Sequence, residues 1–304
     1  MRRLTIILIA IVLPLVMSAQ ALPFVAADYS PVTAAKGGAS VVETSSTAYA
    51  AFTNAAAVPF SRLKGDFAFG YSLWQPSSLK TNVIGLAGSY NINNKVGIAA
   101  GFTYGMNPEY EVFDAGGVSD GFFRPSQTQV NLGVSWRFIK YLALGVNLGY
   151  AGQKLAEKHG YGAFTSDIFL MTEVKGFKAA LGISNLASKV KSASGDKFAL
   201  PSSLTVGLGY SADFAQKHSI DVDADLDYYF HKAFTAAVGA GYTFNDLLSV
   251  RAGYHYGGKS VIPSYASAGL GVKFFGVTID CAYLIAGKDS PMKNTLSLSA
   301  GYRF

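Results

Sequence analysis

The sequence is poor in the residues that build catalytic and metal centres. It has 304 residues and a single cysteine, Cys281, so no internal disulfide can form, and this thiol is most simply a small apolar residue on a strand. The four histidines do not form a cluster with cysteine: His159, His218, His231 and His255. We therefore expect no enzyme, no catalytic motif or phosphate-binding loop, no metal site and no cofactor.

Long apolar runs are absent beyond the first residues of the chain. Arg2 and Arg3 precede an apolar stretch from 4 to 16, and Ala19-Gln20-Ala21 follows as a small-x-small cleavage site. This pattern predicts a cleaved signal peptide over residues 1–21. The apolar stretch is shorter than the roughly 20 residues that a membrane-spanning helix needs. Since no later apolar run approaches that length, we expect any membrane span to be a β-barrel.

Charge is also scarce, because only 14% of the residues are Asp, Glu, Lys or Arg. Without the predicted signal peptide, 23 basic and 19 acidic residues remain, a net charge of +4. The basic residues are spread along the chain without a cluster. Such a distribution gives no case for a nucleic-acid partner.

What the sequence has in abundance is short runs of alternating apolar and polar residues, separated by Gly, Pro, Asn, Asp and Lys. Their length of about ten residues suits a tilted strand that crosses a bilayer. They predict an all-β protein, a transmembrane antiparallel β-barrel of about fourteen strands. The runs lie at 66–74, 82–92, 95–106, 127–138, 141–153, 164–174, 177–186, 202–213, 218–230, 233–244, 247–256, 264–274, 276–285 and 294–304.

The connections between these runs alternate in length, as in outer-membrane barrels with short periplasmic turns and long outer loops. The short connections are Asn93-Asn94, Ile139-Lys140, Lys175-Gly176, 214–217, Asn245-Asp246 and Phe275-Gly276. The long ones are 107–126, 154–163, 187–201, 257–263 and 286–293. One connection breaks the rule, because His231-Lys232 is short on the predicted outer side.

The two faces of the strands differ in size as well as in polarity. The outward face of the run at 127–138 carries Val130, Leu132, Val134, Trp136 and Phe138, whereas its inward face carries Asn131, Gly133, Ser135 and Arg137. Inward residues that are small and weakly polar indicate a lumen that is largely occupied. The segment from 28 to 60 does not alternate and predicts short helices and turns, so we assign residues 22–64 as a plug and 65–304 as the barrel.

The last run ends the sequence on an aromatic residue. Tyr302 and Phe304 lie on its apolar face, and Arg303 on its polar face. This ending resembles the C-terminal signal that the barrel-assembly machinery reads in outer-membrane proteins. The alternative is a half-buried edge strand of a soluble sheet, which shows the same alternation.

One run carries four acidic residues on its inward face, separated by roughly 7 Å from one to the next: Asp221, Asp223, Asp225 and Asp227. It is not an EF-hand, because Leu226 and Lys232 stand where that loop needs Gly and Glu. We expect either a salt-bridge network that holds the plug or a cation or substrate site. Possible counter-charges in the lumen are Arg251, His255, Lys273, Arg303, Lys36 and Arg62.

The first ninety residues resemble the PorV/PorQ family. The resemblance rests on Leu22-Pro23-Phe24, on the Gly-rich turn Gly37-Gly38-Ala39, on the run ending at Asn54-Ala55-Ala56 and on Gly70-Tyr71-Ser72-Leu73-Trp74. The family's Asn-Pro-Ala is changed here, because Ala55 replaces its proline. Members are outer-membrane barrels related to the FadL transporters, with fourteen strands and an N-terminal plug. The resemblance therefore implies a FadL-like barrel in the outer membrane, surrounded by lipid, and plug roles for Gly37, Gly38 and Asn54.

Two functions remain open. The resemblance implies a component of type IX protein secretion that binds secreted cargo proteins or other secretion components through the loops at 107–126, 187–201 and 286–293. The alternative is a FadL-like channel that takes up a hydrophobic ligand through the plug and releases it laterally.

Overall fold

The computed structural model describes residues 21–114, 116–156, 159–187, 189–191, 197–230, 233–257 and 262–304. The predicted signal peptide therefore lies outside the described residues except for Ala21, and so does the short connection His231-Lys232. No helix in the described part of the chain is long and apolar enough to cross a membrane.

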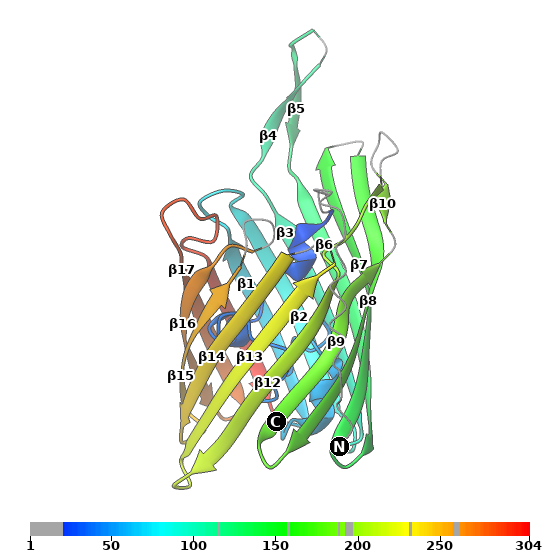
Figure 1. Cartoon of the computed structure of the whole chain (residues 1–304). Coiled ribbons are helices and arrows are strands. Elements are labelled where there is room, and N and C mark those ends of the chain that lie inside the picture. Colours follow the sequence, from blue (N-terminus) through cyan, green and yellow to red (C-terminus); the bar gives the residue numbers. More distant parts are fainter. Residues whose placement is uncertain are drawn as a thin grey trace, which may run out of the picture.

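Fourteen strands of the described chain close into one antiparallel barrel, which confirms the predicted fold (Figure 1). Each barrel strand pairs with the next barrel strand along the chain, so that β3 pairs with β6 and β9 with β12, and the first barrel strand pairs with the last. The barrel strands are β1 (Gly65–Trp74), β2 (Thr81–Asn91), β3 (Val96–Met106), β6 (Ser126–Ile139), β7 (Leu142–Ala156), β8 (His159–Val174), β9 (Phe177–Ala187), β12 (Ser203–Phe214), β13 (His218–Tyr229), β14 (Ala233–Phe244), β15 (Leu248–Tyr256), β16 (Tyr265–Phe274), β17 (Val277–Ile285) and β18 (Leu296–Arg303).

The alternation of the sequence decides which side chains face outward. On β6, Trp136 is 60% exposed while its neighbour Ser135 is 2% exposed, because successive side chains of a strand point to opposite faces. The tight connections also occur as predicted. They rest on backbone with positive φ, at Asn94 (56°), Lys175 (50°) and Asn245 (55°), which lets two neighbouring strands turn back within a few residues.

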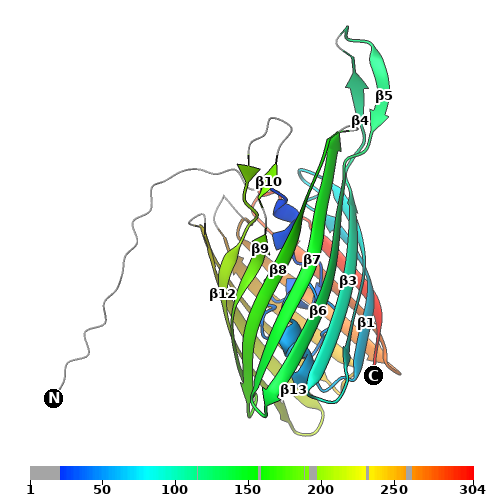
Figure 2. The same ribbon diagram turned by 90° about the vertical axis from the view of Figure 1, so that its right-hand side faces the viewer.

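Two of the predicted long loops contain additional strands, which is a correction to the sequence prediction. Residues 107–126 form a hairpin of β4 (Tyr110–Phe113) and β5 (Ser119–Phe123) that projects beyond the barrel (Figure 2). Residues 187–201 contain the short pair β10 (Val190–Lys191) and β11 (Lys197–Phe198). These strands have two to five residues, too few for a period-two pattern to stand out.

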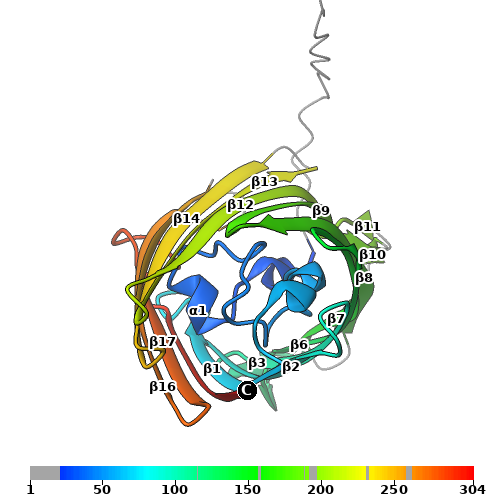
Figure 3. The same cartoon turned by 90° about the horizontal axis from the view of Figure 1, so that it is seen from below.

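The N-terminal segment runs through the interior of the barrel (Figure 3). It contains the 3-10 turn η1 (Pro23–Ala26), the short helix α1 (Pro31–Ala34) and the 3-10 turn η2 (Ala55–Phe60). The small residues of the wall make room for it. A Cβ atom at Gly239 would lie 2.5 Å from the Cα of Lys36, and one at Gly145 would lie 2.3 Å from the backbone nitrogen of Ala56.

The barrel closes where β1 meets β18, with Ser72 opposite Ser297. Both side chains face the interior, and their Oγ atoms are 2.9 Å apart. Two cysteines in these positions would have the separation that a disulfide requires.

We predict that the double variant Ser72→Cys/Ser297→Cys, made in a Cys281→Ala background, forms a disulfide when it is oxidised. The bond would join the first and last strands, so the heat-denatured chain would migrate as a closed loop on a non-reducing gel. The matched control pairs Ser72→Cys with Ser299→Cys, two residues further along β18 and a diagonal roughly 7–8 Å away. Equal cross-linking of both pairs would contradict the register.

Candidate functional site

A buried lysine joins the N-terminal segment to the acidic strand β13. The side chain of Lys36 is 1% exposed and forms ion pairs with Glu43, with Asp221 Oδ2 at 2.8 Å and with Asp223 Oδ2 at 2.5 Å. Lys178 from β9 lies 3.0 Å from the second oxygen of Asp223. Two ammonium groups and three carboxylates thus form one network, with members from the segment and from the wall.

The charges in this network support one another. Burial alone disfavours the charged ammonium, but the carboxylates of Glu43, Asp223 and Asp221 more than offset it and hold the pKa of Lys36 well above its usual range. Burial likewise opposes ionisation of Glu43, yet the ammonium of Lys36 brings the pKa of this carboxyl well below its usual range. Both groups on the segment are therefore charged at neutral pH.

The carboxylate oxygens of Glu43, Asp221 and Asp223 lie within 4.8 Å of one another, a spacing that a metal ion can bridge. In this structure the ammonium of Lys36 makes ion pairs with all three. Asp221 and Asp223, in the half of β13 nearer the tight turns, thus belong to a salt-bridge network that holds the segment. This is one of the two arrangements expected from the sequence.

The Gly-rich turn that follows α1 brings Lys36 to this position. Gly37 and Gly38 have φ of 73° and 85°, which side chains rarely allow. A Cβ atom at Gly37 would also lie 2.6 Å from the carbonyl oxygen of Tyr254 on β15. The turn is fastened to the wall because the backbone N–H of Gly37 donates to Ser267 Oγ at 2.9 Å. Glycine at position 37 is required by both backbone angle and space.

Asn54 organises the second part of the segment. Its Nδ2 donates to the carbonyl of Val41 at 2.8 Å, and its Oδ1 accepts from the N–H of Ala56 at 2.8 Å. The latter bond caps the start of η2. Asn54 therefore ties the two arms of the segment to each other within the lumen.

The predicted counter-charges Arg251, His255, Lys273, Arg303 and Arg62 do not pair with the acidic strand, which is a correction. Arg251 and Arg303 both bind Asp280, at 2.8 and 2.9 Å. Lys273 pairs with Asp246 in a turn, and Arg62 with Asp213. His255 lies 3.2 Å from the carbonyl of Gly37 through Nδ1. Strand alternation predicts a face, but the partner also depends on the height of each side chain along the barrel.

Arg303 instead belongs to a second network. Its Nε lies 3.3 Å from Asp66 Oδ1, and its Nη2 donates to Ser46 Oγ at 3.0 Å. The other oxygen of Asp66 accepts from the backbone N–H groups of Thr47 and Ala48, at 2.8 and 3.1 Å. This network holds the middle of the segment against the seam between β1 and β18.

Asp225 and Asp227, in the half of β13 nearer the long loops, have a different environment. Asp225 Oδ2 accepts from the N–H groups of Ser40 and Val41, at 2.6 and 2.9 Å. Asp227 accepts from the hydroxyl groups of Thr205 and Thr235, at 2.5 and 3.3 Å. These two carboxylates have neutral hydrogen-bond donors as partners, whereas Asp221 and Asp223 have lysines.

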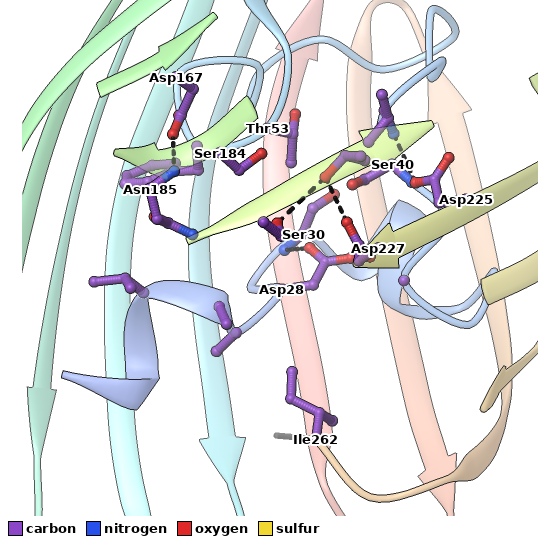
Figure 4. A pocket seen from close by; sticks show the side chains of 18 of the residues that line it. Asp28, Ser30, Ser40, Thr53, Asp167, Ser184, Asn185, Asp225, Asp227 and Ile262 are labelled. Carbon is purple, nitrogen blue, oxygen red and sulfur yellow. Dashed lines mark hydrogen bonds between the residues drawn. The ribbon is translucent and has the colours of Figure 1, made fainter. Parts of the chain in front are cut away.

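Both of these carboxylates line a cavity of about 120 Å³ inside the barrel (Figure 4). The segment contributes Asp28 and Tyr29 to its lining, and the wall contributes Phe169. Asp28 Oδ1 accepts from the N–H of Ser30 at 2.9 Å. Burial raises the pKa of Asp28 to about 6, so this carboxyl is largely ionised at neutral pH.

A β-bulge lies in the wall beside this cavity, and the sequence analysis missed it. Between the pairs Ser166 with Leu186 and Ile168 with Ile183, β9 has one residue more than β8. Asn185 has φ of 54°, and its N–H donates to the side chain of Asp167 at 2.7 Å instead of to a neighbouring strand. An asparagine is among the few residues that adopt this φ, which is the one local signal of the bulge.

The same part of β9 marks the end of its pairing with β12. The last pair joins Ser184 to Ser203. Beyond this pair, toward the long loops, Ser202 Oγ donates to the carbonyl of Asn185 at 2.5 Å. A side-chain hydrogen bond therefore stands where the next backbone hydrogen bond between the two strands would be. Asp167, Ser184, Asn185 and Ser203 all line the cavity, which therefore lies directly behind the irregular part of the wall.

The barrel has the fold of bacterial toluene transporters. TbuX of Ralstonia pickettii and TodX of P. putida each superpose with a TM-score of 0.64 at 13% identity, over 91% of this chain and 98% of theirs. No protein-family model and no curated protein matches the sequence. The predicted fourteen-stranded barrel fold is thereby confirmed, while membership of the FadL-related PorV/PorQ family stays a prediction.

Two stretches of this barrel match spacings of known sites, contrary to the expectation of no catalytic motif. Gly117-Val118-Ser119-Asp120-Gly121 has the spacing of a nucleophile elbow, but Ser119 begins β5 in the projecting hairpin, not a turn from strand to helix. Residues 253–260 have the spacing of a phosphate-binding loop, but 253–256 belong to strand β15 and 258–260 lie outside the described residues. Neither match has the backbone context of its motif.

Tyr302 and Phe304, the residues of the predicted assembly signal, lie on the outer surface of the barrel. Phe304 stacks on Phe67 of β1 with ring centroids 6.2 Å apart. Its carbonyl accepts from the N–H groups of Lys64 and Gly65, at 2.7 and 3.0 Å. Their role in assembly stays a prediction.

We predict that Lys36→Met destabilises the protein by about 3–5 kcal/mol, because it leaves the buried carboxylates of Glu43 and Asp223 and the partly buried one of Asp221 without their shared cation. The free energy of unfolding can be measured with urea after refolding in detergent. Adding Glu43→Gln and Asp223→Asn to Lys36→Met should recover part of the loss.

The control for this prediction is Lys273→Met. Lys273 pairs with Asp246, whose side chain is 78% exposed, so its removal should cost less than about 1 kcal/mol. Equal stability of the Lys36 and Lys273 variants would show that the buried network does not hold the segment.

Proposed function

We propose that the protein is a non-enzymatic outer-membrane barrel through which hydrophobic small molecules enter the cell. The observation that carries the proposal is the interior cavity directly behind the β8–β9 bulge, in a barrel with the fold of two toluene transporters. A passage needs an entrance, a holding site and an exit, and each has a structural candidate.

The outer surface supports a location in lipid. Its exposed side chains along the barrel strands are Leu, Val, Ile and Phe, with Tyr and Trp among them. The fourteen barrel strands of the described chain are paired in a closed ring, so the barrel has no open sheet edge that lipid would leave without hydrogen-bond partners. A hydrophobic solute that leaves the barrel laterally would therefore pass directly into an apolar environment.

The entrance of the proposed path lies at the end of the barrel that carries the long loops. There η1 packs in an apolar cluster of Leu22, Phe24 and Val25 with Val190 and Leu200 from the β9–β12 connection. Val25 and Ala26 also line the cavity. A hydrophobic solute would reach the cavity by displacing this cluster.

The proposed exit is lateral, because the segment fills the lower lumen. The two ionic networks bind residues 36–48 to the wall below the cavity. At the level of the cavity, side chains of Asp167 and Ser202 bind backbone groups of Asn185 that would otherwise belong to the strand ladder. Such side-chain bonds can open without separating two whole strands.

We predict that deletion of Asn185 abolishes uptake of [¹⁴C]toluene. Removing the extra residue lets β8 and β9 pair without a bulge and seals the wall behind the cavity. Uptake is measured in intact Gram-negative cells without their own transporter for this solute, and a loss of at least about tenfold is expected. Folding of the variant is checked by its heat-dependent gel mobility.

The matched control is Asn185→Gly, which keeps the extra residue and accepts the φ of 54°. This variant should retain wild-type uptake. The proposal fails if the deletion variant is folded and takes up toluene at the wild-type rate, or if the wild-type chain gives no uptake above cells without it.

A second candidate is the role in type IX secretion that the PorV/PorQ resemblance implies. The β4–β5 hairpin favours it, because it extends from the predicted contact loop 107–126 and presents apolar side chains to solvent. Phe122 is 69% exposed, and Phe113 and Val118 are also exposed. An exposed apolar patch of this kind is typical of a protein contact site.

We predict that removal of residues 110–123 leaves mature cargo in the periplasm if this second function holds. The cut should leave the barrel intact, because the N–H of Asn107 donates to the carbonyl of Pro125 at 3.0 Å and closes the base of the hairpin. Cargo is located by cell fractionation. Normal secretion by cells that lack the whole gene would exclude this function, and unchanged toluene uptake by the hairpin variant would separate it from the first.

A further inference from the structure

We propose that a groove at the loop end of the barrel wall binds the phosphate head of an anionic membrane lipid. The groove has a volume of about 590 Å³. It lies where β1 and β3 end and β2 begins, at the base of the β4–β5 hairpin (Figure 2). This inference shares the location in lipid with the proposed function but not the transport, because a barrel that takes up toluene need not hold a lipid.

The register of the strands places the groove at the edge of the lipid-facing surface. Tyr71 of β1 and Tyr104 of β3 lie on the outward face, on either side of the same residue of β2. Two residues nearer the long loops, Leu73 and Met106 lie in the same way on either side of Asn82, and all three line the groove. Tyrosines of a membrane barrel gather at the level of the lipid head groups. The groove is therefore at the height at which a lipid carries its phosphate.

The first argument for an anionic head is charge. Lys80 and Arg124 line the groove, and no Asp or Glu belongs to its lining. Lys80 has no carboxylate partner in the described part of the chain. Arg124 Nη2 lies 3.7 Å from Glu109 Oε2, and these side chains are 56% and 47% exposed. Such an exposed pair is weak. The guanidinium can therefore exchange it for a phosphate, which an arginine binds through two parallel hydrogen bonds.

The second argument is that the two amides of the groove also offer hydrogen-bond donors. Asn82 Oδ1 accepts from the hydroxyl of Tyr71 at 2.7 Å, and Asn107 Oδ1 accepts from the hydroxyl of Thr81 at 3.0 Å. Among the described residues, neither amide nitrogen has a hydrogen-bond partner. All four polar side chains of the lining thus present N–H groups, from an ammonium, a guanidinium and two amides. Such a set fits a ligand whose oxygens only accept.

The third argument distinguishes a lipid from a free phosphate ion. The other half of the lining is apolar and consists of Leu73, Pro76, Met106 and Pro108. A free ion would leave this surface in water, whereas the glycerol and the first methylene groups of a lipid would cover it. Toward the tight turns, the outward face of β3 continues with the exposed side chains of Phe102 and Ile98, along which an acyl chain can lie.

The test is native mass spectrometry of the full-length barrel in detergent, titrated with dihexanoyl phosphatidic acid. We expect the wild type to retain one lipid in a saturable manner. Dihexanoyl phosphatidylcholine, whose head has no net charge, should bind at least about tenfold more weakly, because it offers the lysine and the arginine no net negative charge. Inorganic phosphate at the concentration of the lipid should not displace the phosphatidic acid.

The first variant removes the two cations. Lys80→Gln/Arg124→Gln should weaken binding of phosphatidic acid at least about tenfold, because two charge-assisted hydrogen bonds are lost. The matched control is Lys95→Gln/Lys140→Gln, which removes the same charge from exposed side chains in the tight turns at the other end of the barrel. This control should bind as the wild type does.

The second variant reverses one amide without removing its structural hydrogen bond. Asn82→Asp keeps the oxygen that accepts from Tyr71 and places a negative charge in the groove, so binding should again fall at least about tenfold. The matched control is Asn93→Asp in a tight turn, where the side-chain oxygen accepts from the backbone N–H groups of Lys95 and Val96. Folding of each variant is checked by its heat-dependent gel mobility.

Four results would overturn the proposal: no retained phosphatidic acid, equal retention of phosphatidylcholine, displacement by inorganic phosphate, or wild-type binding by the folded groove variants. An equal loss in a groove variant and in its control would do the same, since it would show only the effect of total charge. Toluene uptake takes no part in this test, so its outcome is independent of the outcome for the proposed function.

Discussion

The arrangement of the interior depends on one buried ammonium group. Lys36 directly precedes the two-glycine turn Gly37-Gly38 and binds Glu43 of its own segment and Asp221 and Asp223 of the wall. Such a cluster tolerates burial only when every member is present, because each isolated charge would be strongly unfavourable in a dry interior. The segment therefore has one position in the barrel. The network also closes the cavity on the side nearer the tight turns.

The wall and the segment depend on each other. Glycines such as Gly239 and Gly253 leave the space that the backbone of Lys36 fills. In return, the segment supplies hydrogen bonds to wall residues that would otherwise be buried without partners, for example from Ser40 and Val41 to Asp225. A barrel of fourteen strands with so many small inward residues would be poorly packed without this occupant.

The irregular features lie together on one side of the barrel. The bulge at Asn185 and the end of the β9–β12 pairing both border the interior cavity. Bulges occur often beside functional sites because they redirect side chains and interrupt the ladder. The proposed lateral passage uses this region of the wall.

The sequence by itself determined the strand count, the inward and outward faces and the tight turns, because a period of two and the turn residues are local properties of the chain. It also placed the four aspartates of β13 on one face. Only the tertiary structure decided which cations meet them. Lys36 was one of six candidate counter-charges, and Lys178 was not among them although it pairs with Asp223. Arg251 and Arg303 pair with Asp280 instead. The physical reason is that a partner depends on strand stagger and on the path of the N-terminal segment, and both arise from closing the barrel around it.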